Sequence, residues 1–108
     1  MPLSKRARIE IYLPNAAPYR RLQTILEREL LYTFGGCTVV PETKGSYLNA
    51  EGGTEVEGIS VIYADAPFDF DKNLEAVDVY AQRLKEIALE SSGEESVLVV
   101  IHEIYHSN

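Results

Sequence analysis

Residues 102–106 carry the most specific chemical pattern in the sequence, His-Glu-Ile-Tyr-His. This is the H-E-x-x-H arrangement of zinc peptidases. On a helix, His102 and His106 would lie one turn apart and could bind one zinc ion, while Glu103 would activate a zinc-bound water. A zinc-dependent hydrolase is therefore one hypothesis for this chain.

Residues 96–105, which include most of this motif, have the composition of a strand. Five of these residues are β-branched and favour extended backbone: Val97, Val99, Val100, Ile101 and Ile104. On a strand, positions four apart are separated by about 13 Å, so the two histidines could not share a metal. The sequence holds only these two histidines, so a third ligand would have to be a carboxylate. We therefore favour a strand over 96–105 and expect no metal or cofactor.

A second pair of polar residues flanks Gly52-Gly53, which favours a tight hairpin turn. Tyr47 and Glu57 would face each other across this hairpin, and such a pair on a sheet face could anchor a small molecule. We predict these two residues as ligand-binding residues. A small metal-free enzyme that uses them as polar anchors is an alternative.

Carboxylates gather in the same half of the chain. Glu55 and Glu57 share one strand face, and Asp65, Asp69 and Asp71 surround the next loop. Several carboxylate oxygens could hold a divalent cation, but the EF-hand spacing is missing. Acidic residues also stabilise the start of a helix. We interpret the group as a solvated edge and a helix N-terminus.

Cys37 is the single cysteine of the sequence. No internal disulfide is possible, and the histidines that could activate a thiolate are far away along the chain. We predict a small buried residue in a strand rather than a nucleophile. The lack of disulfides fits a reducing compartment, and residues 1–14 lack the apolar stretch of a signal peptide. We expect a cytoplasmic protein with no membrane span.

Length and charge narrow the class of protein further. The 108 residues, 45% hydrophobic and 25% charged, predict a single globular domain over 1–108. A net charge of -7 argues against nucleic-acid binding, which needs a basic surface. Arginines are concentrated in the first 30 residues, where an anion site is possible, but we interpret them as solvated strand and helix faces.

Hydropathy patterns predict the elements that hold these residues. Strands are expected over 7–13, 37–41, 46–48, 54–64 and 96–105, and helices over about 18–34 and about 71–92. Asn15 is expected to cap the first helix, and Asp69 or Asp71 the second. Glycines 35 and 93 are expected to end the two helices. Residues 43–45 are predicted as a turn, and Gly58 as a β-bulge.

This order predicts an α+β, ferredoxin-like domain, an antiparallel sheet with two helices on one face. The other face must be wet, covered, or paired with a second copy, and Tyr12 and Tyr63 are expected to line it. We therefore predict self-association through the sheet, for example as a homodimer. The function that fits best is a non-enzymatic binding or interaction module acting as a homo-oligomer.

Residues 34–63 resemble a group of small uncharacterised bacterial proteins. The shared features are a helix followed by Gly35-Gly36-Cys37-Thr38, then Gly45-Ser46-Tyr47, then an acidic residue before a hydrophobic strand over 55–63. Tyr47 stands where the group carries tryptophan. The resemblance implies a ferredoxin-like α+β domain and carries no activity to this chain.

Overall fold

The computed structural model describes residues 3–66, 71–92 and 97–107. Its elements are β1 (Leu3–Pro14), α1 (Arg20–Phe34), β2 (Thr38–Leu48), β3 (Thr54–Asp65), α2 (Leu74–Ser92) and β4 (Leu98–Ser107). Short 3₁₀ turns, Ala17–Tyr19 and Asp71–Asn73, precede the two helices. Asp69 and Gly93, predicted at the ends of the second helix, lie outside the described residues.

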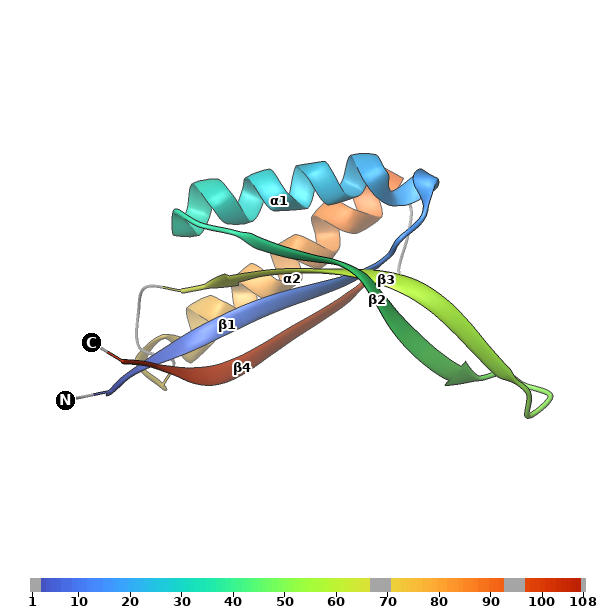
Figure 1. Cartoon of the computed structure of the whole chain (residues 1–108). Helices are drawn as coiled ribbons and strands as arrows, with labels where there is room; N and C mark the ends of the chain where they lie inside the picture. Colours follow the sequence, from blue (N-terminus) through green and yellow to red (C-terminus); the bar gives the residue numbers. More distant parts are fainter. Residues whose placement is uncertain (1–2, 67–70, 93–96, 108) are drawn as a thin grey trace.

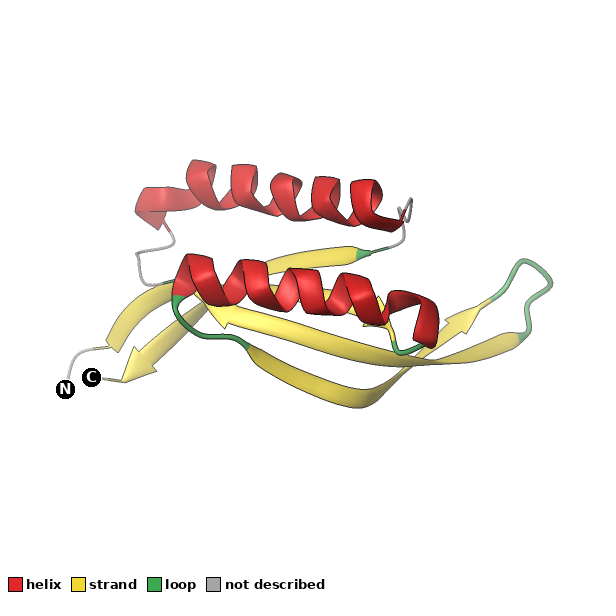
Figure 2. Cartoon of the chain, turned by 90° about the horizontal axis from the view of Figure 1, so that it is seen from above, coloured by secondary structure: helices red, strands yellow, loops and turns green. Residues whose placement is uncertain are grey.

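The strands form one sheet in the order β2-β3-β1-β4, with every neighbouring pair antiparallel. Both helices lie on the same face of the sheet (Figure 1). Seen from above, they run side by side over the strands, and the β2–β3 hairpin extends past them (Figure 2). The predicted ferredoxin-like α+β fold is confirmed.

The core lies between the helices and the sheet. Alternate residues of β1 point into it, and all are buried: Ala7, Ile9, Ile11 and Leu13. Leu22, Leu26 and Leu30 of α1 cover Ile9, Ile11 and Leu13, because positions four apart share one helix face. Burying each leucine side chain contributes about 1.5–3 kcal/mol to stability. This packing fixes which face of each strand is left outside.

The start of the first helix differs from the prediction. Asn15 does not cap it; its backbone N–H donates to the carbonyl of Gly58 at 2.8 Å, because β1 is still paired with β3 at this point. The helix ends as predicted. Gly35 has a left-handed φ of 82°, and its N–H donates to the Leu31 carbonyl at 2.8 Å.

The predicted turn over residues 43–45 is wrong, and so are the separate strands on either side of it. Residues 38–48 form one strand, paired with β3 along its length. The turn-like composition of Pro41 to Gly45 is accommodated by a β-bulge between Val40 and Thr43, where β2 has one residue more than β3. Glu42 takes a left-handed φ of 59° there. The cross-strand pairing outweighs the local preference for a turn.

The predicted bulge at Gly58 is also wrong, because Gly58 pairs with Lys44 in regular register. The hairpin turn itself lies where Gly52-Gly53 indicated. The Asn49 side-chain oxygen accepts hydrogen bonds from the backbone N–H groups of Glu51 at 3.1 Å and Gly53 at 2.8 Å. Gly52 supplies the left-handed conformation, with a φ of 83°.

Candidate ligand-binding site on the open sheet face

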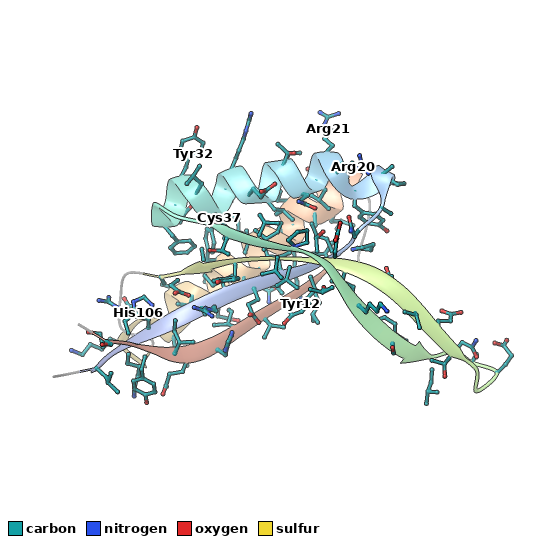
Figure 3. All side chains as sticks on the ribbon, in the orientation of Figure 1. Tyr12, Arg20, Arg21, Tyr32, Cys37 and His106 are labelled. Carbon is teal, nitrogen blue, oxygen red and sulfur yellow. The ribbon has the colours of Figure 1, made fainter. Side chains whose placement is uncertain are left out.

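The sheet face away from the helices, here called the open face, carries the polar residues of the central strands. On β1 these are Arg8, Glu10 and Tyr12, which alternate with the buried core residues. Figure 3 shows Tyr12 on this side, whereas Arg21 and Tyr32 point away from the sheet on α1. Tyr63 lies opposite Glu10 on β3 and shares the open face, as predicted for both tyrosines.

The bulge in β2 determines which side chains of the hairpin join the open face. Before the bulge, Val40 pairs with Val61; after it, Thr43 pairs with Ile59 and Tyr47 with Glu55. The extra residue reverses the alternation of β2, so odd-numbered residues beyond Thr43 face outward. Thr43 also donates from its hydroxyl to the Ile59 carbonyl at 2.7 Å. Tyr47 therefore reaches the open face because of the bulge.

Gly45 makes room for the Tyr47 ring. A Cβ atom at position 45 would overlap the phenol of Tyr47 and the Cδ1 methyl of Ile59. The phenol can thus lie against the strand two residues before its own Cα. Glycine is needed here for the close approach, and its φ is not in the left-handed region.

The β2–β3 hairpin curves away from the helices (Figure 1). A hollow of about 390 Å³ opens on the open face beside it. It is lined by the ends of β1 and β4 and the outer part of the hairpin: Tyr12, Leu13, Pro14, Tyr47, Glu55, Glu57, Ile59 and Leu98. Both predicted ligand-binding residues, Tyr47 and Glu57, line it. Glu57 pairs with Gly45, so it lies diagonally from Tyr47, and Glu55 is the residue directly opposite.

The walls of the hollow are partly apolar and partly open to solvent. Tyr47 is 47% exposed and Leu98 53% exposed, whereas Ile59 is nearly covered. The Tyr12 hydroxyl donates to Glu10 Oε1 at 3.0 Å, and this hydrogen bond raises the pKa of Tyr12. Sequence reasoning did not place Tyr12 and Leu98 in the site, because they come from strands distant along the chain.

A separate polar cluster lies toward the other end of the open face. Arg8 donates from Nε and Nη2 to the two carboxylate oxygens of Asp65, at 2.7 and 3.1 Å. His106 Nε2 is 2.9 Å from Asp65 Oδ2, and the Arg8 guanidinium lies 4.3 Å from the Tyr63 ring centroid. The hydrogen bond from Arg8 is the main cause that lowers the pKa of Asp65. Asp65 is thus held as a carboxylate.

His102 lies near one carboxylate, that of Glu10, without forming a hydrogen bond to it. Its Nε2 atom lies 3.3 Å from Glu10 Oε1, close enough for an ion pair when the ring is protonated. The geometry is not that of a hydrogen bond. His102 Nε2 is thus a buried nitrogen that has no hydrogen-bond partner among the described residues. The contact is therefore a close approach of two groups, and the same Glu10 oxygen also accepts the hydrogen bond from Tyr12.

The H-E-x-x-H residues lie on β4, in the extended conformation expected from their composition. His102 and His106 face the open side and contact different carboxylates. Glu103 points to the opposite face, where it accepts a hydrogen bond from Tyr105 at 2.7 Å and lies 3.8 Å from Lys5. Within the described residues, no three His, Cys, Asp or Glu side chains are grouped so that they could hold a metal ion.

Cys37 lies between α1 and β2, one residue before the strand, and is half-buried rather than buried. Desolvation raises the pKa of its thiol, with a further contribution from Glu27. The thiol is therefore protonated at neutral pH, which is unfavourable for a nucleophile.

No family model and no curated sequence matches the chain. Solved structures do. CutA1 from Oryza sativa matches with a TM-score of 0.61 at 15% identity, over 97% of this chain and 84% of that one. The divalent cation tolerance protein CutA1 from Thermus thermophilus matches with a TM-score of 0.58 at 16% identity, over 96% and 87%.

A third similar structure is CPII, a nitrogen regulatory PII-like protein from Thiomonas intermedia, bound to ADP, AMP and bicarbonate. It matches with a TM-score of 0.55 at 22% identity, over 99% of this chain and all of that one. At these identities the likeness establishes the small α+β fold. The predicted resemblance to small ferredoxin-like α+β proteins is thus confirmed at the level of structure alone. No helix in the described residues is long and apolar enough to cross a membrane.

Proposed function

We propose that this chain is a non-enzymatic binding module that takes a small molecule in the hollow of its open face. The observation that carries the proposal is the hollow itself, with Tyr47 and Glu57 both on its wall. Binding sites of small molecules are concave and mostly apolar, with a few polar groups that orient the ligand. Ile59 and Leu98 supply apolar surface beside the two polar side chains.

The structural likeness to CPII supports a module of this size as a binder. That protein holds ADP, AMP and bicarbonate in its structure, and it is covered along its whole length by this chain. The identity of the ligand must come from the residues of this chain, because a shared fold does not carry a shared ligand.

We also propose that the module self-associates through its open face. Apolar side chains are left uncovered there by the helices, including Val40, 39% exposed, and the half-buried Val61 and Val100. Val40 pairs with Val61, Val61 with Tyr12 of β1, and Tyr12 with Leu98 of β4, so a row of largely apolar side chains crosses all four strands beside the polar cluster. A second copy of the chain would bury this row.

Sedimentation velocity tests the self-association. The wild type is expected to sediment as a multiple of 12.1 kDa at micromolar concentration, and a Val40→Lys, Val61→Lys variant as the single chain. Val79→Lys is the matched control, because Val79 is 64% exposed on α2 and lies on the opposite side of the molecule. A wild type of 12.1 kDa, or a variant that still assembles, would contradict this part of the proposal.

A fragment library screened by ¹H–¹⁵N correlation spectra tests the binding function. Ligands are expected to shift the resonances of the hollow and to lose affinity in a Tyr47→Leu variant. Tyr32→Leu is the control, because Tyr32 is 83% exposed on α1 away from the sheet. Fragments that bind elsewhere, or that bind the Tyr47→Leu variant equally well, would show that the hollow is not the site.

A further inference from the structure

We infer that the hollow on the open face selects an organic cation, meaning an amine, amidine or guanidine attached to an apolar or aromatic body. The inference deepens the proposed function and rests on the hollow being a ligand site. It follows from the charge, the hydrogen-bonding groups and the ring surfaces on the wall of the hollow.

Among the described residues, the charge on the wall of the hollow is entirely negative. Glu55 and Glu57 are its only charged residues, and no lysine, arginine or histidine among the described residues lines it. The two carboxylates are two positions apart on β3 and therefore share the open face. In the described part of the chain, neither makes a hydrogen bond or an ion pair with another residue. The nearest lysine on β2, Lys44, pairs with Gly58, so its side chain lies on the other face of the hairpin.

The polar groups on the wall mainly accept hydrogen bonds. The carboxylates of Glu55 and Glu57 only accept, and the Tyr12 hydroxyl already donates its proton to Glu10. Toward a ligand, the Tyr12 hydroxyl therefore acts as a hydrogen-bond acceptor. A ligand with several N–H donors can therefore form hydrogen bonds with these oxygen atoms. A ligand rich in acceptor atoms cannot, because these oxygen atoms offer it no donors.

The rings and apolar side chains of the wall would contact the apolar or aromatic part of the ligand. Tyr47 lies flanked by Glu55, directly opposite, and Glu57, diagonally opposite, so a cation held by the carboxylates lies near the face or edge of its ring. Cation–π attraction at such exposed sites contributes about 0.5–1 kcal/mol. Pro14, Ile59 and Leu98 offer apolar contact on the remaining sides.

Other charge classes fit less well. A phosphate or carboxylate ligand would approach two unpartnered carboxylates, with no cation among the described residues of the wall. A bare divalent cation needs about six oxygen ligands, and much of this wall is apolar. Within the described residues no group of three metal-binding side chains occurs. An organic cation uses both the charge and the apolar surface.

Three probes of nearly equal shape and different charge test the inference: benzamidine, benzamide and benzoate. Each is titrated into the protein at low salt and followed by ¹H–¹⁵N correlation spectra. We expect benzamidine to bind about three- to tenfold more tightly than benzamide, because exposed ion pairs contribute modestly. Benzoate is expected to bind more weakly than either. Added salt is expected to reduce the benzamidine preference, because exposed charges are screened.

Two double variants separate the carboxylates of the hollow from the net charge of the chain. Glu55→Gln, Glu57→Gln is expected to remove the preference for benzamidine over benzamide. Glu51→Gln, Glu90→Gln removes the same number of charges from the hairpin tip and α2, and is expected to retain it. Thermal unfolding of both variants verifies that each is folded.

The possible outcomes separate the two proposals. Equal binding of benzamidine and benzamide in the hollow would overturn the charge preference and leave the binding function standing. Tighter binding of benzoate than of benzamidine would also overturn the charge preference and leave the binding function standing. If no probe shifts the hollow while a library fragment of another class does, the cation inference is wrong and the binding function holds. If neither probe nor fragment shifts it, both are wrong.

Discussion

Arg8 and Asp65 form a two-pronged ion pair across β1 and β3, with N–O distances of 2.7 and 3.1 Å. The two residues are directly opposite in the register, 57 positions apart along the chain. Each side chain keeps less than a third of its surface exposed. The pair therefore joins the two central strands on the face that has no helix, and its loss has a predictable dependence on pH.

Asp65→Asn is expected to lower the free energy of unfolding at pH 7 by about 1–2 kcal/mol, because a partly buried charged pair loses one partner. The pKa of Asp65 is lowered in the folded state, mainly by Arg8. Its contribution is therefore complete above the unfolded pKa of about 4 and is lost as the pH falls through the lower folded value. Urea denaturation at pH 7 and near pH 2 should show the difference shrinking in acid. Asp78→Asn on exposed α2 is the control; an equal loss there would contradict a specific pair.

Gly45→Ala is expected to destabilise the protein by about 1–3 kcal/mol, because the added methyl overlaps the Tyr47 phenol and Ile59. Chemical denaturation measures the loss. Gly36→Ala has open space around its Cβ and should cost much less. Adding Tyr47→Ala to the Gly45→Ala variant should recover part of the stability, because the phenol is then absent. A strictly additive double variant would show that the two residues do not interact.

Tyr80 connects the two helices. Its hydroxyl donates to Glu29 Oε1 at 3.2 Å, and its ring packs at 5.1 Å against Phe34 with the planes at 83°. Burial raises the pKa of Tyr80 to about 12. The unfolded chain then loses this proton more readily, so stability should fall as the pH rises from about 10 to 12.

Ultraviolet titration of the wild type and a Tyr80→Phe variant isolates this group among the seven tyrosines. The difference spectrum should show one phenol titrating near pH 12. Tyr32→Phe, at an exposed position, is the matched control for the loss of one phenol. At neutral pH, Tyr80→Phe should cost about 0.5–1.5 kcal/mol in unfolding experiments. A Tyr80 difference centred near 10 would mean that the ring is not packed as described.

Elemental analysis tests the H-E-x-x-H pattern. Protein purified without chelators is expected to hold no stoichiometric zinc, and His102→Ala, His106→Ala is expected to leave the metal content unchanged. The reason is that the two histidines contact separate carboxylates and Glu103 lies on the other side of β4. One zinc per chain, lost in the variant, would require these residues to adopt another arrangement.

Strand alternation was the most informative signal in the sequence. Ile9 and Ile11 point to the core and Arg8 and Glu10 away from it, as a period of two requires. The β-branched residues between 97 and 104 likewise predicted a strand, β4, rather than the helix that a zinc-binding H-E-x-x-H motif needs. These elements could be predicted because their local preference agrees with their place in the fold.

Local preference failed where cross-strand pairing opposed it. The segment Pro41 to Gly45 has turn residues, yet it continues β2 because β3 pairs with it on both sides of the bulge. Tyr47 and Glu57 could be predicted as neighbours from the hairpin alone. Tyr12 and Leu98 could not, because only the order of strands in the sheet brings their ends to the same hollow.

The bulge at Glu42 gives β2 one residue more than its pairing with β3 needs. Deleting this one residue would leave every side chain of the hairpin unchanged in type. It would also leave Thr43 opposite Ile59 and Tyr47 opposite Glu55, so Tyr47 would remain on the open face. A related chain that is one residue shorter at this position would therefore keep the same ligand site, with a regular strand in place of the bulge.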